Sequence, residues 1–319
     1  MRRRSVLLVI AIALASALTF VPAAPAEAAR LKVGIGDQSA DTFSNPLFTR
    51  TLRVKRTRLI VPWDAANTAG GRASVRTWMS AARKRRMEIM VAFNHSSGDA
   101  CPGKPCKAPS TRSYQRAVKR FHRLFRRYGV RIYQPWNESN SRTQPTSGNR
   151  GARKVAAYYR VLVRMCGRRC TVTGADIQDI GAYTKYTKTF LRAVGRRKPK
   201  IMGLHNYSDT NRRGYRRTAA FVRAMPRGTR IWLTETGGIY SFQQQDGTVS
   251  LPASESRQAR SMSHMFRIQR RYRRVIDRIY VYQWRKTNSF DRFDAGVVNF
   301  DGTPRRAYRV LRKYRRYFR

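Results

Sequence analysis

Short apolar runs alternate with amphipathic segments along most of this chain. The runs are continuously apolar rather than alternating with polar residues, which is typical of parallel strands that helices cover. Eight of them predict strands at Leu31–Gly36, Thr57–Trp63, Met87–Asn94, Val130–Trp136, Thr171–Asp176, Ile201–Asn206, Thr229–Thr234 and Arg278–Trp284.

The segments between these runs carry apolar residues at spacings of three and four, which predicts helices with one buried face. The clearest extends from Tyr114 to Tyr128, and others cover Tyr183–Val194 and Ala307–Tyr314. Eight strand–helix units predict an α/β fold, a single-domain (β/α)8 TIM barrel. A doubly wound open sheet is the main alternative, but Gly34-x-Gly36 lacks the third glycine of its phosphate loop.

The first 28 residues have the pattern of a secretory signal peptide. Three arginines at 2–4 precede an apolar run that ends near Phe20, and small residues follow up to Ala28. The run is short for a membrane span, which needs about 20 residues. We therefore expect residues 1–28 to be removed, residues 29–319 to form one secreted domain, and no membrane association after cleavage.

Four cysteines in an exported chain favour disulfides. Local pairing, Cys101 with Cys106 and Cys166 with Cys170, is the simplest of the three connectivities. A zinc site is the alternative, although neither pair has the usual two-residue gap.

The formal charge of +50 is extreme and favours anionic neighbours such as acidic polysaccharide, cell-wall polymer or nucleic acid. The basic residues are spread over the polar faces of many predicted helices, so we interpret them first as a solvent-exposed surface. An exported chain meets little nucleic acid, and we expect no nucleic-acid partner. The basic surface should also discourage self-association, which predicts a monomer.

The carboxyl ends of the strands carry the active site in a barrel of this kind. Carboxylates there can transfer protons and glycosyl groups, amides and imidazoles can bind hydroxyl groups, and aromatic faces can stack on sugar rings. This composition predicts a sugar-binding cleft, and the strand-end residues are Asp37, Trp63, Asp64, Asn94, His95, Trp136, Asn137, Glu138, Asp176, His205, Tyr207, Glu235 and Trp284.

Glutamates are scarce, and only four follow the leader. Glu88 lies at the start of a strand, and Glu255 lies in the first turn of a helix, where a negative charge suits the helix dipole. Glu138 and Glu235 each end an apolar strand instead, where a carboxylate is costly unless it is paired or used. Two carboxylates that face each other are what glycosidic-bond hydrolysis requires.

These residues resemble the clan A glycoside hydrolases, retaining enzymes with a (β/α)8 fold. The resemblance rests on Asn137-Glu138 at the fourth strand, Glu235 at the seventh, His205-x-Tyr207 after the sixth and Trp284 after the eighth, and it covers the whole mature chain. The family's arginine near the end of the second strand is not matched, because Arg58 lies early in that strand and Trp63-Asp64 stands at the mouth instead.

The resemblance implies a role for each matched residue. Glu138 would be the acid/base, Glu235 the nucleophile, and Asn137 would bind the sugar 2-hydroxyl. Tyr207 would bind Glu235, and Trp284 would form the floor beneath the sugar. The other expected contacts to sugar are His205, Asn94, His95, Trp63 and Trp136.

The implied activity is hydrolysis of a β-linked polysaccharide such as glucan, mannan or xylan, by double displacement and without a metal or organic cofactor. The alternative is a weak or inactive barrel that binds cell-wall polysaccharide through aromatic and basic residues. An anionic cell-wall polymer is a further candidate partner for the basic surface.

Overall fold

A parallel sheet forms the centre of the molecule. The computed structural model describes residues 31–288 and 290–319, so the expected leader lies outside the described residues and its removal stays a prediction. The strands are hydrogen-bonded in the order β5–β4–β3–β2–β1–β11–β8–β7–β6. They are β1 (Lys32–Gly36), β2 (Arg56–Pro62), β3 (Glu88–Asn94), β4 (Val130–Gln134), β5 (Thr171–Val172), β6 (Asp176–Gln178), β7 (Ile201–His205), β8 (Arg230–Thr236) and β11 (Ile276–Tyr282).

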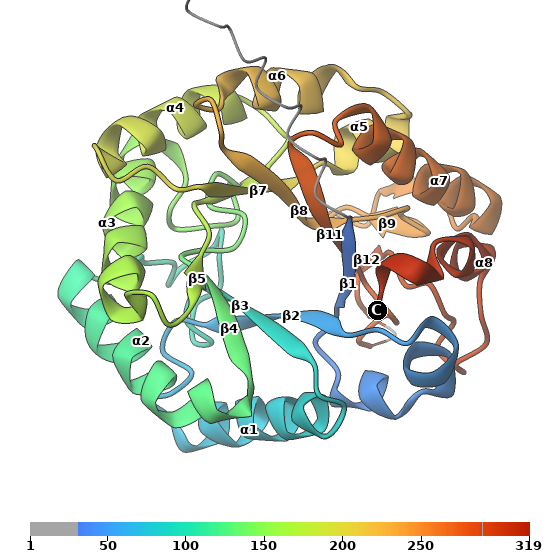
Figure 1. Cartoon of the computed structure of the whole chain (residues 1–319), viewed down its shortest axis with the longest axis horizontal. Coiled ribbons are helices and arrows are strands. Elements are labelled where there is room, and N and C mark those ends of the chain that lie inside the picture. The colour runs from blue at the N-terminus through green and yellow to red at the C-terminus, as the bar shows by residue number, and fades with distance from the viewer. Residues whose placement is uncertain (1–30, 289) are drawn as a thin grey trace, which may run out of the picture.

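The end strands β5 and β6 are two pieces of the single strand expected at Thr171–Asp176. β5 pairs with β4, and β6 pairs with β7. Between them, Thr173 N donates to Tyr133 O at 3.0 Å and Gly174 N donates to Ile201 O at 2.7 Å. These bonds join the two ends of the sheet, so the strands close into the ring seen in Figure 1. The expected (β/α)8 barrel is confirmed.

Helices surround the barrel on its outer side (Figure 1). In α2, Ser110 caps the first turn by accepting from Ser113 N at 3.1 Å. The buried residues of this helix are Tyr114, Ala117, Val118, Phe121 and Phe125. The helices are α1 (Ala69–Lys84), α2 (Thr111–Phe125), α3 (Gly148–Cys166), α4 (Tyr183–Val194), α5 (Tyr207–Arg212), α6 (Arg216–Ala224), α7 (Glu255–Arg271) and α8 (Arg306–Lys313).

The crossover from β1 to β2 contains short helical turns in place of a regular α-helix. These are a 3₁₀ helix (Ala40–Ser44) and a π-helical turn (Leu47–Leu52). Pro46 lies between them, and proline has no amide hydrogen with which to continue a helix.

The barrel interior changes character along its axis. Met90, Ile132, Trp232 and Tyr280 form a small apolar cluster separate from the main core. These residues come from four strands around the ring, which places their side chains inside it. Closer to the carboxyl ends the interior becomes polar, with Arg58, Gln134, Asp176 and Thr234 all buried.

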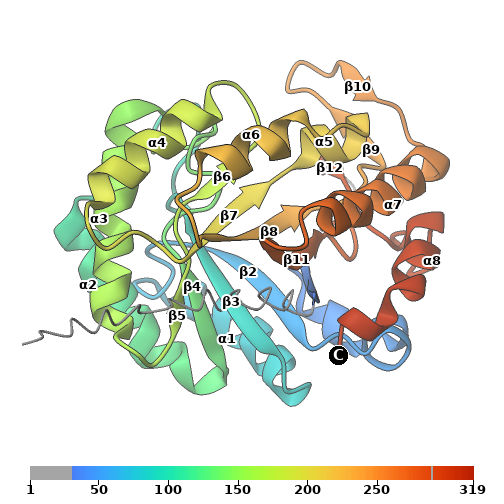
Figure 2. The same cartoon turned by 45° about the horizontal axis from the view of Figure 1, so that its top comes forward.

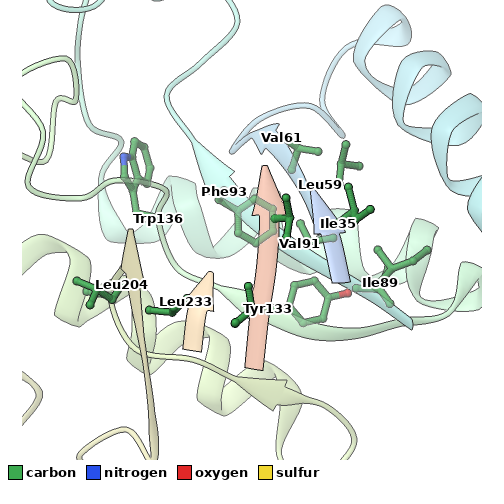
Figure 3. Packing of buried hydrophobic residues seen from close by; sticks show 14 of the residues in the cluster. Ile35, Leu59, Val61, Ile89, Val91, Phe93, Tyr133, Trp136, Leu204 and Leu233 are labelled. Atoms are coloured by element: carbon green, nitrogen blue, oxygen red, sulfur yellow. The ribbon is translucent and has the colours of Figure 1, made fainter. Parts of the chain in front are cut away.

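The main apolar core lies between the strands and the helices. Figure 3 shows part of it, with Val91 and Phe93 on β3 and Leu204 and Leu233 on β7 and β8 among the buried side chains. This continuous layer explains why the strands read as unbroken apolar runs, since their outward side chains are covered by helices.

A small antiparallel sheet stands at the carboxyl end of the barrel. It consists of β9 (Ser241–Gln243), β10 (Val249–Leu251) and β12 (Phe293–Asp294), which belong to the loops after β8 and β11. Figure 2 shows β9 and β10 rising beside α5 and α7. The sheet brings Phe293 within 5.5 Å of the Tyr207 ring and therefore borders the polar end of the barrel.

The structure joins Cys101 to Cys106 and Cys166 to Cys170, the expected local pairing. These bonds close the loop after β3 and the end of α3. Over the described part of the chain, no helix is both long and apolar enough to cross a membrane.

Candidate active site

The two strand-end glutamates meet at the mouth of the barrel. Glu138 follows β4, and Glu235 lies near the end of β8. An oxygen of each carboxylate lies within 4.8 Å of the other. Retaining glycosidases hold their carboxyl groups roughly 5–5.5 Å apart, whereas inverting ones leave about 6.5–9.5 Å for a water molecule. This separation is closer to the spacing of a retaining pair than to that of an inverting pair.

The turn that carries Glu138 has a strained backbone. Glu138 adopts a left-handed conformation with φ 45°, which costs a non-glycine residue on the order of 1–3 kcal/mol. Hydrogen bonds on either side hold this turn, from Asn137 N to Phe93 O at 2.7 Å and from Ser139 N to Asp176 O at 2.9 Å. Neighbouring strands thus fix the direction in which Glu138 points.

Glu235 is buried and surrounded by donors. Arg58 donates to its Oε2 at 2.9 Å, and the Tyr207 hydroxyl donates to its Oε1 at 3.2 Å. Burial raises the pKa of Glu235 above its ordinary value, and the positive charges of His205 and Arg58 offset this only in part. The expected contact between Tyr207 and Glu235 is present. Together, Tyr207 and Arg58 hold the Glu235 carboxylate in one orientation.

Arg58 is part of the site, which corrects the expectation from sequence. Its position early in the strand had indicated that it lies too far from the mouth of the barrel to contact the glutamates. Its side chain is 1% exposed and extends through the polar end of the barrel interior. Besides Glu235, its guanidinium reaches Asn137 Oδ1 at 2.6 Å, Asp176 Oδ2 at 2.7 Å and Gln134 Oε1 at 3.2 Å. A long side chain that starts early in a strand can thus reach the mouth, and here it orients the Asn137 amide.

His205 bridges carboxylates of the site. Its Nδ1 lies 3.1 Å from Glu138 Oε1, and its Nε2 lies 2.8 Å from Asp176 Oδ2. Burial alone would lower the pKa of His205, but the negative charges of Asp176 and Glu235 outweigh burial and raise it to about 10. For Asp176, burial acts to raise the pKa, and His205 and Arg58 bring it below its ordinary value. Asp176 and His205 therefore form a charged pair beneath the glutamates.

Space for this network depends on a glycine. A Cβ atom on Gly203 of β7 would lie within 2.8 Å of side-chain atoms of Asp176, Gln134 and Thr234. Thr234 also donates a hydrogen bond to Asp176. The missing side chain lets the carboxylate of Asp176 sit at the barrel axis, where Arg58 and His205 reach it.

Glu138 is more open than Glu235, with 19% of its side chain exposed. Gln178 Nε2 donates to its Oε1 at 3.0 Å. Glu138 and Gln178 both line a cavity of about 770 Å³, which extends between the loop after β4 and the start of α4. This carboxylate can exchange protons with solvent or with a bound molecule.

Three further expected contacts lie at the ends of β2 and β3, and all are partly buried: Trp63, Asn94 and His95. Trp63 N donates to Asn94 O at 2.9 Å, which ties the two strand ends together. Trp63 Nε1 and Asn94 Oδ1 are buried and have no hydrogen-bond partner among the described residues. The role of these three residues in binding sugar stays a prediction.

Two of the expected aromatic contacts are corrected by the structure. Trp136, labelled in Figure 3, is fully buried. Its indole packs on Tyr158 and donates to Gln144. Trp284 is 1% exposed, with Phe48 and Tyr308 against its ring. In both cases the strand ends two residues earlier than expected, and the tryptophan packs under the outer helices. Neither ring can stack on a bound sugar.

Tyr282 occupies the position expected for Trp284, because β11 ends there. It stacks on Phe293 with 6.3 Å between ring centroids. Burial raises the pKa of Tyr282 well above its ordinary value, and so does the negative charge of Glu235 close by. Tyr282 is thus the aromatic side chain of this strand that borders the glutamates. Its position at the end of an apolar run was the sequence feature that could have identified it as a site residue.

The site is poorly suited to a metal ion. Glu138, His205 and Glu235 are close enough to share one. His205 Nδ1 already lies 3.1 Å from Glu138 Oε1, however, and Arg58 and Tyr207 already donate hydrogen bonds to Glu235. His95, Asp99 and Cys101 form a second group, but the Cys101 sulfur is in a disulfide and is not a thiolate.

The raised pKa of His205 predicts how stability depends on pH. In the folded chain this pKa is about 10, against an ordinary value of 6.5. Its protonation therefore stabilises the fold fully below about pH 6.5, and the contribution is lost as pH rises through about 10. We expect the free energy of unfolding, measured with urea, to fall between about pH 7 and about pH 9. His205→Gln should reduce this slope, and an equal slope in both proteins would contradict the assignment.

Comparison with known proteins supports the fold. No model of a known protein family matches the sequence, and no curated protein matches it. The solved GH39 enzyme from Xanthomonas axonopodis pv. citri superposes with a TM-score of 0.64 and 13% identity, over 90% of this chain and 66% of that chain. An endo-1,4-β-xylanase from Caldicellulosiruptor owensensis superposes with a TM-score of 0.61 and 11% identity, over 89% and 96% of the two chains. A monomeric β-xylosidase from Caulobacter crescentus CB15 gives 0.62 and 13%, over 89% and 67%. The chain thus shares the (β/α)8 fold of these solved enzymes.

Proposed function

We propose that the chain is a retaining glycoside hydrolase that acts by double displacement. The observation that carries this proposal is the pair of glutamates, whose nearest oxygens lie within 4.8 Å. Their surroundings differ as the two roles require. Glu235 is buried and fixed by Arg58 and Tyr207, which suits a nucleophile, whereas Glu138 faces a cavity, which suits a group that exchanges protons.

In the first step, a carboxylate oxygen of Glu235 attacks the anomeric carbon of the sugar. The glycosidic C–O bond breaks, and its oxygen takes the proton of Glu138 as the leaving group departs. The sugar is then an ester of Glu235. In the second step, Glu138 removes a proton from water, the water oxygen attacks the anomeric carbon, and Glu235 leaves as a carboxylate. Two inversions give net retention of configuration.

The charged residues beneath the glutamates act as positioning groups. Arg58 and His205 hold positive charge close to Glu235, which favours its ionised form before attack. Arg58 also fixes the oxygen of Asn137, so that the amide nitrogen is free to donate to the 2-hydroxyl of the sugar. Tyr282 replaces Trp284 as the aromatic surface that we assign beneath this sugar.

For the substrate we propose a β-linked polysaccharide, with xylan tested first because the superposing structures include xylanases and a xylosidase. Glucan and mannan are the other candidates. We further propose that the mature chain, residues 29–319, acts outside the cell, and the two disulfides agree with this location. We also propose that it acts as a monomer.

The configuration of the first product tests this function. Proton NMR of a reaction on a β-linked oligosaccharide should show the β-anomer before mutarotation produces the α-anomer. Initial appearance of the α-anomer would contradict the retaining mechanism. Polysaccharide binding without any hydrolysis would favour the inactive, wall-binding barrel instead.

A further inference from the structure

The cavity beside Glu138 is cationic. Its lining includes Arg142, Lys185, Asn140 and Gln178, and among all its lining residues Glu138 is the one carboxylate. Glu138 donates its proton to the leaving group in the proposed mechanism. The cavity therefore lies on the side of the site that receives the leaving part of the substrate, and this direction rests on the proposed function.

A second cavity lies on the outside of the barrel. It has a volume of about 630 Å³ and lies between α4 and α6, which run side by side in Figures 1 and 2. Lys185 lines both cavities. The second cavity is also lined by Lys188, Arg192 and Lys198, and none of its lining residues is acidic.

The cations of α4 form a stripe along one face of the helix. Lys185, Lys188 and Arg192 are spaced by three and four residues, so they lie on one face and span about 10 Å along the axis. All three are exposed. Within residues 31–288 and 290–319, none of the three forms an ion pair.

Among the described residues, the buried acids Asp179 and Asp209 form no ion pair with this stripe. Asp179 accepts from Ser208 N at 3.1 Å, and Asp209 accepts from Thr218 N at 2.6 Å. Both carboxylates thus satisfy backbone groups inside the fold. A row of unpaired cations that leads away from the catalytic acid is suited to a chain of anionic groups.

We propose that the leaving-group side of the site and the α4 stripe bind a polysaccharide that carries repeated anionic groups. Carboxylates of uronic acids and phosphodiesters share the required chemistry. Arg142 and Lys185 would contact the first charged sugars beyond the cleaved bond, and Lys188 and Arg192 would contact the following ones. The rest of the positive surface would then attract the anionic polysaccharide at long range, whereas the α4 stripe would contact its anionic groups directly.

Binding measurements on Glu235→Gln protein test this proposal without requiring turnover. One probe is glucuronoxylan, compared with the same polymer after its carboxyl groups are reduced to alcohols. A second probe is a glycan whose charge is carried by phosphodiesters. The stripe variant is Lys185→Ala/Lys188→Ala/Arg192→Ala. The matched control is Arg112→Ala/Arg116→Ala/Lys119→Ala on α2, which removes equal charge from exposed positions.

We expect the stripe variant to raise the Kd for at least one charged polymer about tenfold, and the control variant to raise it about twofold or less. On the carboxyl-reduced xylan the two variants should bind alike. The polymer that shows the larger difference identifies the source of the anionic groups. The single substitution Lys188→Glu should likewise weaken binding of the charged polymer more than binding of the carboxyl-reduced xylan.

Equal losses in the stripe and control variants would overturn the proposal, because they would show attraction by net charge alone. Equal binding of charged and reduced xylan, with no response to the phosphodiester glycan, would also overturn it. Both outcomes leave the proposed hydrolysis intact, which is measured separately on neutral polymers.

Discussion

Replacing Glu235 by alanine should abolish hydrolysis of every substrate, with a loss in kcat of about 10⁴-fold or more. The nucleophile is needed in both proposed steps, and among the described residues no other carboxylate is held between Arg58 and Tyr207. The loss should therefore not depend on how good the leaving group is. Initial rates on a polysaccharide and on a dinitrophenyl glycoside measure this directly.

Glu138→Ala should behave differently, which separates the two roles. A dinitrophenolate leaving group departs without a proton, so the first step should survive while hydrolysis of the polysaccharide is lost. Glu255→Gln is the control, because Glu255 is remote from the site and contacts Arg306 N. If Glu235→Ala retained activity on the aryl glycoside and Glu138→Ala lost it, the assignment of roles would be reversed.

Arg58→Met should be the most destabilising substitution in the site. The guanidinium is buried and contacts Glu235, Asp176, Asn137 and Gln134. Its loss leaves two buried carboxylates with one fewer counter-charge, and removal of one partner from a buried ion pair costs roughly 3–5 kcal/mol. Urea unfolding of the two proteins at pH 7 measures the difference.

Arg58→Lys provides the matched variant. A lysine keeps the charge but cannot reproduce the several directed bonds of the guanidinium, so its stability should fall between wild type and Arg58→Met. Activity should fall in both, because Asn137 and Glu235 lose a shared donor. An unfolding free energy of Arg58→Met within about 0.5 kcal/mol of wild type would contradict this account.

The barrel and the glutamates were predictable because they depend on local pattern. Apolar runs that alternate with amphipathic helices establish the order of strands, and a strand-end glutamate stands out in a chain with few acids. The break between β5 and β6 was not predictable, since it depends on bonds from Thr173 and Gly174 to neighbouring strands.

The errors in the site share a physical cause. An apolar run does not reveal where a strand stops and its chain turns outward. β4 and β11 end two residues early, and so Trp136 and Trp284 belong to the outer core while Tyr282 borders the glutamates. Arg58 was missed because the reach of its side chain, rather than its place in the strand, brings it to the mouth.

Trapping of the glycosyl-enzyme tests the central claim most directly. A 2-deoxy-2-fluoro glycoside with a dinitrophenyl leaving group should esterify the nucleophile and then hydrolyse slowly, because the fluorine destabilises the charged transition state of the second step. It is prepared from the sugar of whichever polysaccharide the chain cleaves. Mass spectrometry of the intact protein should show one added glycosyl group, and peptide mapping should place it on Glu235. A label on any other residue, or cleavage of the parent glycoside with inversion, would contradict the account.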